Sequence, residues 1–271
     1  MLGCYLNEEI IYAWQANDKK ADYRCPECKG EVILKKGIYK IPHFAHKANL
    51  GCTFGEGITE EHLMVQKDIY EILTSMGFYC ELECRRFEHR RADIYAEIND
   101  KKIIFEVQHS SITPQEILAR NQYYSRQGCS VIWILTPDFF GKLKARVNPE
   151  KGIRLSQWQI RLTEIYGCLY AWWDKKLMAY QFDYARRSLS FDARTGEYVD
   201  VGEYQLKTTF EKLGYAEIDL AWAIRNNTLL TFDDEFFNTS CFGLSPDIDY
   251  AANWSFPDEH YRFSDPLTIA G

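Results

Sequence analysis

The segment 92–108 constrains the fold of this chain more than any other. Its two halves alternate apolar and polar residues, which is the side-chain period of a β-strand, and Asn99-Asp100 lies between them. Asparagine and aspartate favour a two-residue hairpin loop at such a place. Continuing the strand register outward from that loop places Asp93 directly opposite Glu106. Residues opposed in this way have Cβ atoms about 4.5–5.5 Å apart.

The two faces of this hairpin differ in chemistry. One face is wholly apolar and is expected to meet the core: Ala92, Ile94, Ala96, Ile98, Ile103, Phe105 and Val107. The other face carries four polar residues among two apolar ones: Asp93, Glu97, Glu106 and Gln108, with Tyr95 and Ile104. A solvated outer face is one interpretation of this acidic alternation. The other interpretation is a bound cation, because two like charges directly opposite each other destabilise a sheet.

The pair of carboxylates on Asp93 and Glu106 is suited to Mg²⁺ or Mn²⁺. Mg²⁺ binds through one or two carboxylates and keeps several waters, one of which can attack a phosphodiester. Gln108, on the same face, would orient that water. The hairpin therefore predicts a catalytic metal site for hydrolysis of a phosphodiester bond.

A helix is expected over 59–76, ended by Gly77. Glu61 heads a stripe of apolar residues on one face of this helix: Val65, Ile69, Ile72 and Met76. The Glu61 carboxylate would complete the metal shell, or it is simply an acid favoured by the helix dipole. The neighbouring His62 is expected to orient a partner residue rather than to bind the metal.

The elements around the hairpin predict a mixed sheet flanked by helices, an α+β fold. Strands are expected over 79–85, 92–98 and 101–108. A helix capped by Thr113 then runs to about Gln127, and the apolar run 130–135 follows as a strand buried on both faces. This order implies one crossover connection. The aromatic C-terminal region is β-rich, with a hairpin over 169–182 whose turn is 174–176.

Basic residues precede the first catalytic candidate. Four arginines lie just before Asp93 and a fifth lies on the following helix: Arg85, Arg86, Arg90, Arg91 and Arg120. These side chains are candidate DNA contacts near the metal. The alternatives are a solvated turn for the cluster and an ion pair with Glu116, four residues away, for Arg120.

Cysteine and histidine spacing in the first 57 residues predicts a zinc site. Cys25 and Cys28 have C-x-x-C spacing, which aims two thiolates at one point. His46 and Cys52 supply the second pair, with His43 as the rival for the histidine position. Such a closed four-ligand site is structural, and it replaces a core that about 50 residues cannot build. The alternative is two free thiols and two ordinary histidines.

Composition limits the cellular setting and the partners. The chain has nine cysteines, an odd number, and free buried thiols in a reducing compartment explain the six outside the cluster best. No long apolar run and no signal peptide are recognisable, so we expect a cytoplasmic protein with no membrane partner. The net charge of −7 belongs to the C-terminal part: residues 1–160 carry 22 basic and 21 acidic residues, and 161–271 carry 10 and 18.

These residues together make the chain resemble the competence CoiA-like family. The resemblance rests on Cys25-Pro26-Glu27-Cys28, His43-Phe44-Ala45-His46, Glu61-His62, Arg91-Ala92-Asp93-Ile94, Glu106-Val107-Gln108 and the 131–135 strand, over roughly residues 1–140. It implies a zinc-finger-like front and a nuclease core of the PD-(D/E)xK superfamily. It also implies DNA handling in uptake, recombination or defence, with a metal on Asp93 and Glu106 assisted by Glu61. The sequence departs from the superfamily pattern at Gln108, where a lysine is usual.

The sequence therefore predicts a zinc-finger-like module over 1–57, a nuclease-like core over 58–148 and a C-terminal region of unknown role over 149–271. The first hypothesis is a metal-dependent deoxyribonuclease with structural Zn²⁺ and catalytic Mg²⁺ or Mn²⁺. The second is a catalytically weak or inactive DNA-binding factor of the same fold. DNA that is single-stranded or has free ends is the expected partner, and recombination proteins are further candidates.

Overall fold

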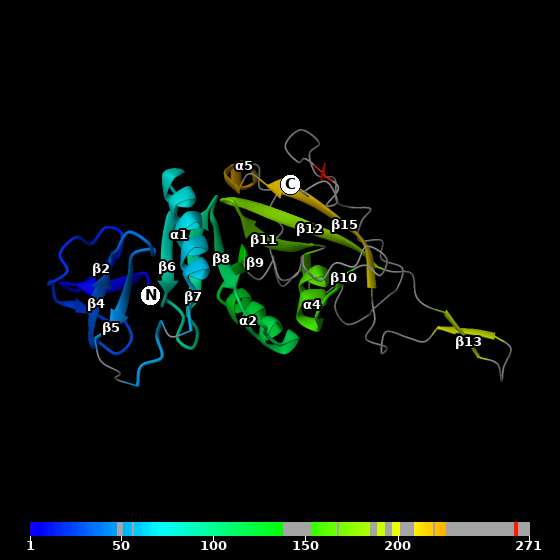
Figure 1. The fold of residues 1–271 in the computed structure, drawn as a ribbon, viewed down its shortest axis with the longest axis horizontal. Coiled ribbons are helices and arrows are strands. Elements are labelled where there is room, and N and C mark those ends of the chain that lie inside the picture. Colours follow the sequence, from blue (N-terminus) through cyan, green and yellow to red (C-terminus); the bar gives the residue numbers. More distant parts are fainter. Residues whose placement is uncertain are drawn as a thin grey trace. The chain divides into compact units, whose positions relative to one another are not determined.

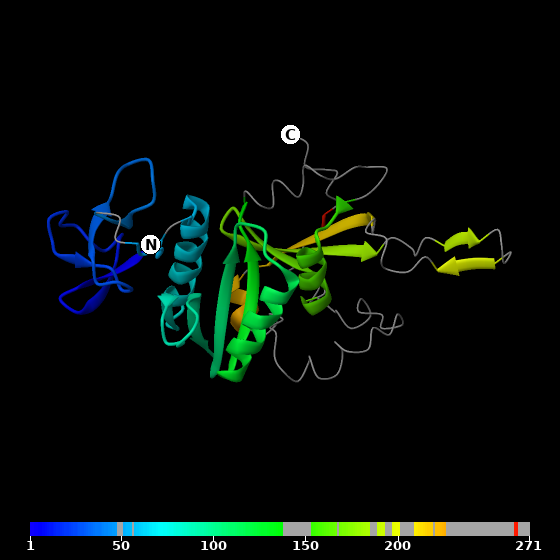
Figure 2. The ribbon, with the colours of Figure 1, turned by 90° about the horizontal axis from the view of Figure 1, so that it is seen from below.

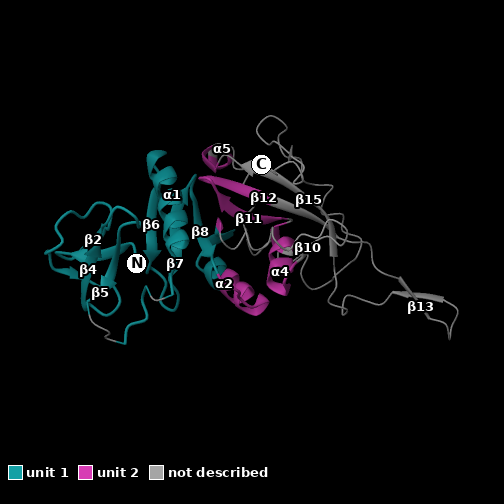
Figure 3. Cartoon of the chain, in the orientation of Figure 1, with its two compact units in different colours: residues 1–109, 123–136 teal, residues 110–122, 137–271 magenta. Residues whose placement is uncertain are grey.

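The computed structural model describes residues 1–47, 51–55, 57–137, 153–166, 168–184, 189–192, 197–200, 209–218, 220–225 and 263–264. The chain divides into two compact units, coloured teal and magenta in Figure 3. Unit 1 comprises Met1–His109 and Tyr123–Thr136, and unit 2 comprises Ser110–Gln122 and Pro137–Gly271.

The first sheet of unit 1 has five antiparallel strands in the order β2-β1-β3-β4-β5 (Figure 1). The strands are β1 (Gly3–Leu6), β2 (Glu9–Tyr12), β3 (Tyr23–Arg24), β4 (Glu31–Lys35) and β5 (His43–His46). Its small core is built around Tyr23 and Phe44, whose rings lie 4.9 Å apart between centroids. We call residues 1–55 the N-terminal module. Its apolar core is small, which fits the expectation that a metal supports it.

The second sheet of unit 1 runs in the order β9-β8-β7-β6. Its strands are β6 (Tyr79–Cys84), β7 (Ala92–Ile98), β8 (Lys101–Gln108) and β9 (Cys129–Leu135). β6, β7 and β8 are antiparallel neighbours, whereas β8 and β9 are parallel. The helix α2 (Pro114–Arg126) separates β8 from β9 in the sequence, as a parallel pair requires. The predicted mixed sheet with one crossover is confirmed.

The hairpin of β7 and β8 has the predicted register. Its pairs run from Ile98 opposite Lys101 to Ile94 opposite Phe105. Asn99 and Asp100 have φ angles of 49° and 65°, so both residues of the loop are left-handed, as a type I′ turn requires. The apolar face is buried along its whole length, with no side chain on it more than 6% exposed.

The helix α1 (Glu60–Ser75) lies beside this sheet in both Figure 1 and Figure 2 and packs on β6, β7 and β8. The Thr59 hydroxyl accepts a hydrogen bond from the His62 N–H and caps the helix. The buried positions are His62, Leu63, Val65, Gln66, Ile69 and Leu73. The predicted stripe headed by Glu61 is therefore shifted, because Ile72 and Met76 are only partly buried. A search for apolar residues misses two of the inward positions, since His62 and Gln66 are polar.

Unit 2 contains an antiparallel sheet in the order β10-β15-β12-β11. Its elements are β10 (Ile153–Arg154), α4 (Gln157–Tyr166), β11 (Leu169–Trp173), β12 (Lys176–Tyr184), β15 (Thr209–Ile218), α5 (Leu220–Arg225) and β16 (Phe263–Ser264), which pairs with β15. A separate hairpin joins β13 (Leu189–Asp192) and β14 (Glu197–Asp200). The predicted hairpin over 169–182 is present, but its turn holds two residues, Asp174 and Lys175, rather than three.

Candidate metal centre and nuclease-like site

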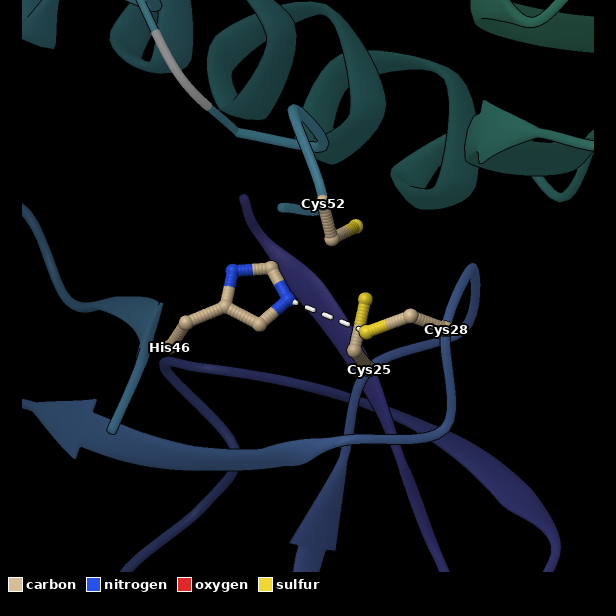
Figure 4. Close-up of side chains that lie close together, drawn as sticks. All are labelled: Cys25, Cys28, His46 and Cys52. Carbon is tan, nitrogen blue, oxygen red and sulfur yellow. Dashed lines mark hydrogen bonds between the residues drawn. The ribbon is translucent and has the colours of Figure 1, made fainter. Parts of the chain in front are cut away.

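The turn after β3 presents two sulfur atoms on one side (Figure 4). Cys25 and Gly30 close the turn, since the Cys25 N–H donates to the Gly30 carbonyl at 2.8 Å. The Glu27 N–H donates to Cys25 Sγ and the Gly30 N–H donates to Cys28 Sγ, each at 3.4 Å. Backbone N–H groups that point at sulfur favour the thiolate, which is the form that binds metal.

His46 on β5 and Cys52 complete a group of four ligands with Cys25 and Cys28. The four ligand atoms all lie within 4.8 Å of one another, and Cys28 Sγ is 3.4 Å from His46 Nε2. Tetrahedral zinc with bonds of about 2.0–2.3 Å separates its ligands by about 3.3–3.8 Å, so this donor set fits zinc. His43 is not part of the group, because its Nδ1 faces the Ile41 carbonyl at 2.9 Å.

The two cysteines of the turn differ in their pKa values. The Gly30 N–H, with His46 beside it, lowers the pKa of Cys28 to about 7. Burial raises the pKa of Cys25 to about 11. Four protein ligands leave no open position for water, so the cluster is consistent with a structural zinc site rather than a catalytic one.

The Asp93 carboxylate, on β7, is held by hydrogen bonds from two directions. The Val107 N–H on β8 donates to Oδ2 at 2.8 Å. Gln66 Nε2 on α1 donates to Oδ1 at 3.2 Å and reaches the Asp93 carbonyl at 3.3 Å. His62 Nε2 lies 3.2 Å from the same Oδ1. The carboxylate is thus oriented by α1 and β8 together.

The face of the hairpin that carries Asp93 is closed over most of its length. Glu106 is 2% exposed and Gln108 is 9% exposed, while the Asp93 side chain is 21% exposed. The β7–β8 pairs end at Ile94 opposite Phe105, and Asp93 and Glu106 are the next residues along the two strands. The interpretation of this face as a solvated outer face is therefore wrong for Glu106 and Gln108.

His62 is the buried group that the sequence interpretation undervalued. Burial by itself lowers the pKa of an imidazole, but the carboxylates of Asp93, Glu83 and Glu106 outweigh it and raise the pKa of His62. The His109 ring meets the His62 ring edge-to-face at 5.2 Å, and burial together with His62 lowers the pKa of His109. His62 and Gln66 are polar residues four positions apart on the buried face of the helix. That spacing is the sequence signal by which both could have been chosen.

Glu61 lies in the first turn of α1. It lies next to the buried residues of α1 and is itself only partly buried. Within the part of the chain that the structure describes, the Cys3His cluster is the one grouping of three or more possible metal ligands. A metal held by Asp93 and Glu106 with help from Glu61 therefore stays a prediction.

The arginines proposed as DNA contacts take part in contacts within their own units. The Phe54 ring lies 4.6 Å from the Arg85 guanidinium and 4.2 Å from that of Arg91, and Arg85 also pairs with Glu27 at 2.6 Å. These contacts join the N-terminal module to the second sheet. Three further arginines have ring or ion-pair contacts: Arg86 with Tyr79, Tyr95 and Glu81, Arg90 with Tyr123, and Arg120 with Glu116. DNA binding by the five arginines stays a prediction.

Glu83 is a further buried acid, which no sequence pattern singled out. It has a φ of 51° and interrupts the regular pairing of β6 with β7 between Leu82 and Cys84. Its Oε2 accepts hydrogen bonds from the N–H groups of Leu2 and Gly3, each at 3.1 Å. Glu83 thus fixes β1 of the N-terminal module to β6.

Comparison with known families finds two matches along the chain. Residues 7–55 match "Competence protein CoiA, N-terminal domain" and residues 59–166 match "Competence protein CoiA, nuclease-like domain". The chain belongs to the competence protein CoiA family. The first match contains all four members of the Cys3His cluster, and the second contains Asp93, Glu106 and Gln108. The resemblance deduced from the sequence is confirmed.

Among curated proteins, competence protein CoiA of Bacillus subtilis (strain 168) is 27% identical over 161 residues. That alignment covers 59% of this chain and 40% of the relative, so the chain spans well under two thirds of the relative's length. No solved structure matches. Among the described residues, no helix combines the length and apolar character needed to cross a membrane.

Proposed function

We propose that this CoiA-family chain is a metal-dependent deoxyribonuclease. The observation that carries the proposal is the Asp93 carboxylate, which hydrogen bonds from α1 and β8 orient, beside a neighbouring strand that carries the buried Glu106. Two carboxylates that meet on adjoining strands are a fitting donor set for Mg²⁺ or Mn²⁺. When bound there, such an ion would lower the pKa of a coordinated water and stabilise charge on the phosphoryl oxygens.

The chain's own residues would have separate tasks around that ion. Asp93 and Glu106 would hold it, and the Val107 N–H would keep Asp93 aimed across the hairpin. Gln108 follows Glu106 by two residues on the same strand face and would orient water through its amide. His62 and Gln66 would act as positioning residues, because each contacts an oxygen of the Asp93 carboxylate and so orients it.

Membership of the CoiA family supports the proposed partner and setting. DNA with single-stranded regions or free ends is the proposed substrate, in competence, recombination or defence, inside the cytoplasm. Recombination proteins are the proposed protein partners. The Cys3His cluster would serve as the structural support of a module that holds the DNA.

Purified protein incubated with linear duplex and single-stranded DNA, with Mg²⁺ or Mn²⁺, tests the proposal. We expect cleavage by the native chain and its loss in Asp93→Asn and Glu106→Gln. Glu97→Gln is the matched control, since Glu97 lies on β7 with Asp93 but is exposed. Cleavage that persists in Glu106→Gln would assign the activity to another site or to a contaminant.

A non-catalytic DNA-processing factor is the second candidate. The observation that favours it is Gln108, which cannot bring the positive charge that lysine supplies at this position of the superfamily pattern. A protein of this kind would bind DNA without cleaving it with either metal. Full DNA binding together with no cleavage by the native chain would select this candidate over the first.

A further inference from the structure

The connection between β4 and β5 displays the two most exposed large apolar side chains among the described residues. Ile38 is 89% exposed and Tyr39 is 91% exposed. The four other exposed large apolar side chains in the described part of the chain lie between 45% and 50%. Single exposed apolar residues are common on protein surfaces, but these two stand out because they are adjacent and almost fully exposed.

Hydrogen bonds hold this connection, residues 36–42, at both ends. They fix the position of its tip, Ile38 and Tyr39. At its start, Lys36 Nζ donates to the Trp14 and Ala16 carbonyls, at 3.1 and 2.8 Å, and to Asn17 Oδ1 at 3.0 Å. At its end, the Ile41 N–H donates to Glu60 Oε1 at 3.0 Å. The tip is therefore presented by anchored strands rather than by a long unsupported loop.

Two lysines lie beside the tip, and one of them also lines a cavity. Lys35 and Lys40 flank the two apolar residues, and both are exposed. Lys40 also lines a cavity of about 470 Å³, together with His46 and Cys52 of the Cys3His cluster, Lys47 and Glu60. Lys47 pairs with Glu31 at 2.8 Å, so Lys35 and Lys40 are the basic groups considered at the tip.

We propose that the 36–42 connection is a contact surface for single-stranded nucleic acid, in which a base stacks on Tyr39 and Lys35 and Lys40 contact phosphates. Proteins bind single strands by combining aromatic platforms with basic side chains, and the tip has both elements in one short segment. Ile38 would widen the apolar surface beside the stacked base. This inference deepens the proposed function, because it states how the proposed substrate would be held.

Binding of a fluorescent oligothymidine to the full chain, measured by anisotropy without added Mg²⁺ or Mn²⁺, tests the proposal. Removal of an aromatic side chain on which one base stacks costs about 5- to 160-fold in affinity, so Tyr39→Ala should weaken binding by at least about fivefold. Tyr39→Trp should bind like the native chain and Tyr39→Leu should not, because stacking needs an aromatic ring. Equal affinity of Tyr39→Leu and the native chain would overturn the stacking role.

The salt dependence of oligothymidine affinity tests the role of the lysine charges. Each phosphate contact to a single strand contributes about 0.7 to the slope of log affinity against log salt, so Lys35→Gln with Lys40→Gln should reduce the slope by about 1.4. Lys19→Gln with Lys20→Gln is the matched control, since both are exposed lysines of the same module. An equal loss of slope in the control pair would overturn the assignment to the tip.

Two other outcomes separate this inference from its alternatives. Vesicles with anionic lipid that bind the native chain but not Tyr39→Ala, with oligothymidine binding unchanged, would overturn the proposal in favour of a membrane contact. DNA cleavage is measured independently on the Tyr39 variants. A native chain that cleaves duplex DNA but does not bind oligothymidine would overturn the tip surface and leave the nuclease proposal intact.

Discussion

His62 Nε2 lies 3.2 Å from Asp93 Oδ1, and this contact joins the first turn of α1 to β7, the first strand of the β7–β8 hairpin. The imidazole is 5% exposed, and Gln66, one helical turn later, reaches the same oxygen. The position of the acid proposed to hold a metal therefore depends on two polar side chains of a helix distant in sequence.

We expect His62→Ala and Gln66→Leu to lower nuclease activity by about 10- to 100-fold, the usual cost of losing a group that orients a metal ligand. The effect should appear mainly in kcat, because neither residue touches the DNA in this proposal. Met64→Ala is the control, since Met64 is on the same turn and exposed. Kinetics and far-UV circular dichroism of each variant check this. A variant that stays folded with native kcat would show that Asp93 needs no such support.

The raised pKa of His62 predicts a pH dependence of stability. A folded-state pKa above the unfolded value of about 6.5 means that the folded protein binds the proton more tightly. The stabilisation is fully present below about pH 6.5 and is lost as the pH rises through the folded-state pKa. Urea unfolding of native protein and His62→Gln, across pH 5 to about 9, should show a difference that shrinks with rising pH. A difference that grows with pH would contradict this sign.

Loss of a thiolate from the Cys3His cluster should remove the metal and the module's stability together. Cys25→Ser should contain about one zinc fewer per chain than the native protein and unfold at a lower temperature. Cys80→Ser is the control, because Cys80 is a buried cysteine outside the cluster. Elemental analysis and thermal unfolding provide the readout. Equal zinc content in the native protein and Cys25→Ser would reject the assignment.

The loop of the central hairpin offers a gain in stability. Asp100 has a φ of 65°, where glycine has no steric cost. Relief of about 1–2 kcal/mol of left-handed strain, offset by about 0.4–1 kcal/mol of unfolded-state entropy, should make Asp100→Gly more stable by up to about 1 kcal/mol. Asp100→Val should be less stable, because a branched side chain resists this φ. Denaturant unfolding of the two variants should give shifts of opposite sign, and shifts of one sign would refute the turn assignment.

Much of the fold could be deduced from local patterns. Thr59 and Thr113 each accept a backbone hydrogen bond at the start of the expected helices, and the Asn99-Asp100 loop fixes the hairpin register. The Cys3His set followed from spacing alone, and the structure decided between His43 and His46 by the direction of one ring. Glu83 could not be deduced, because its role depends on a strand irregularity that presents its carboxylate to β1.

The sequence by itself determined which residues alternate, which turns they form and which ligands are spaced for zinc, because these depend on neighbours a few positions apart. Only the tertiary structure decided that His62 and Gln66 reach the Asp93 carboxylate. That contact depends on how α1 is rotated against β7 and β8, and the rotation is set by packing of the buried residues of α1. It also decided that Glu106 and Gln108 are buried, since burial of a strand face requires elements from elsewhere in the chain.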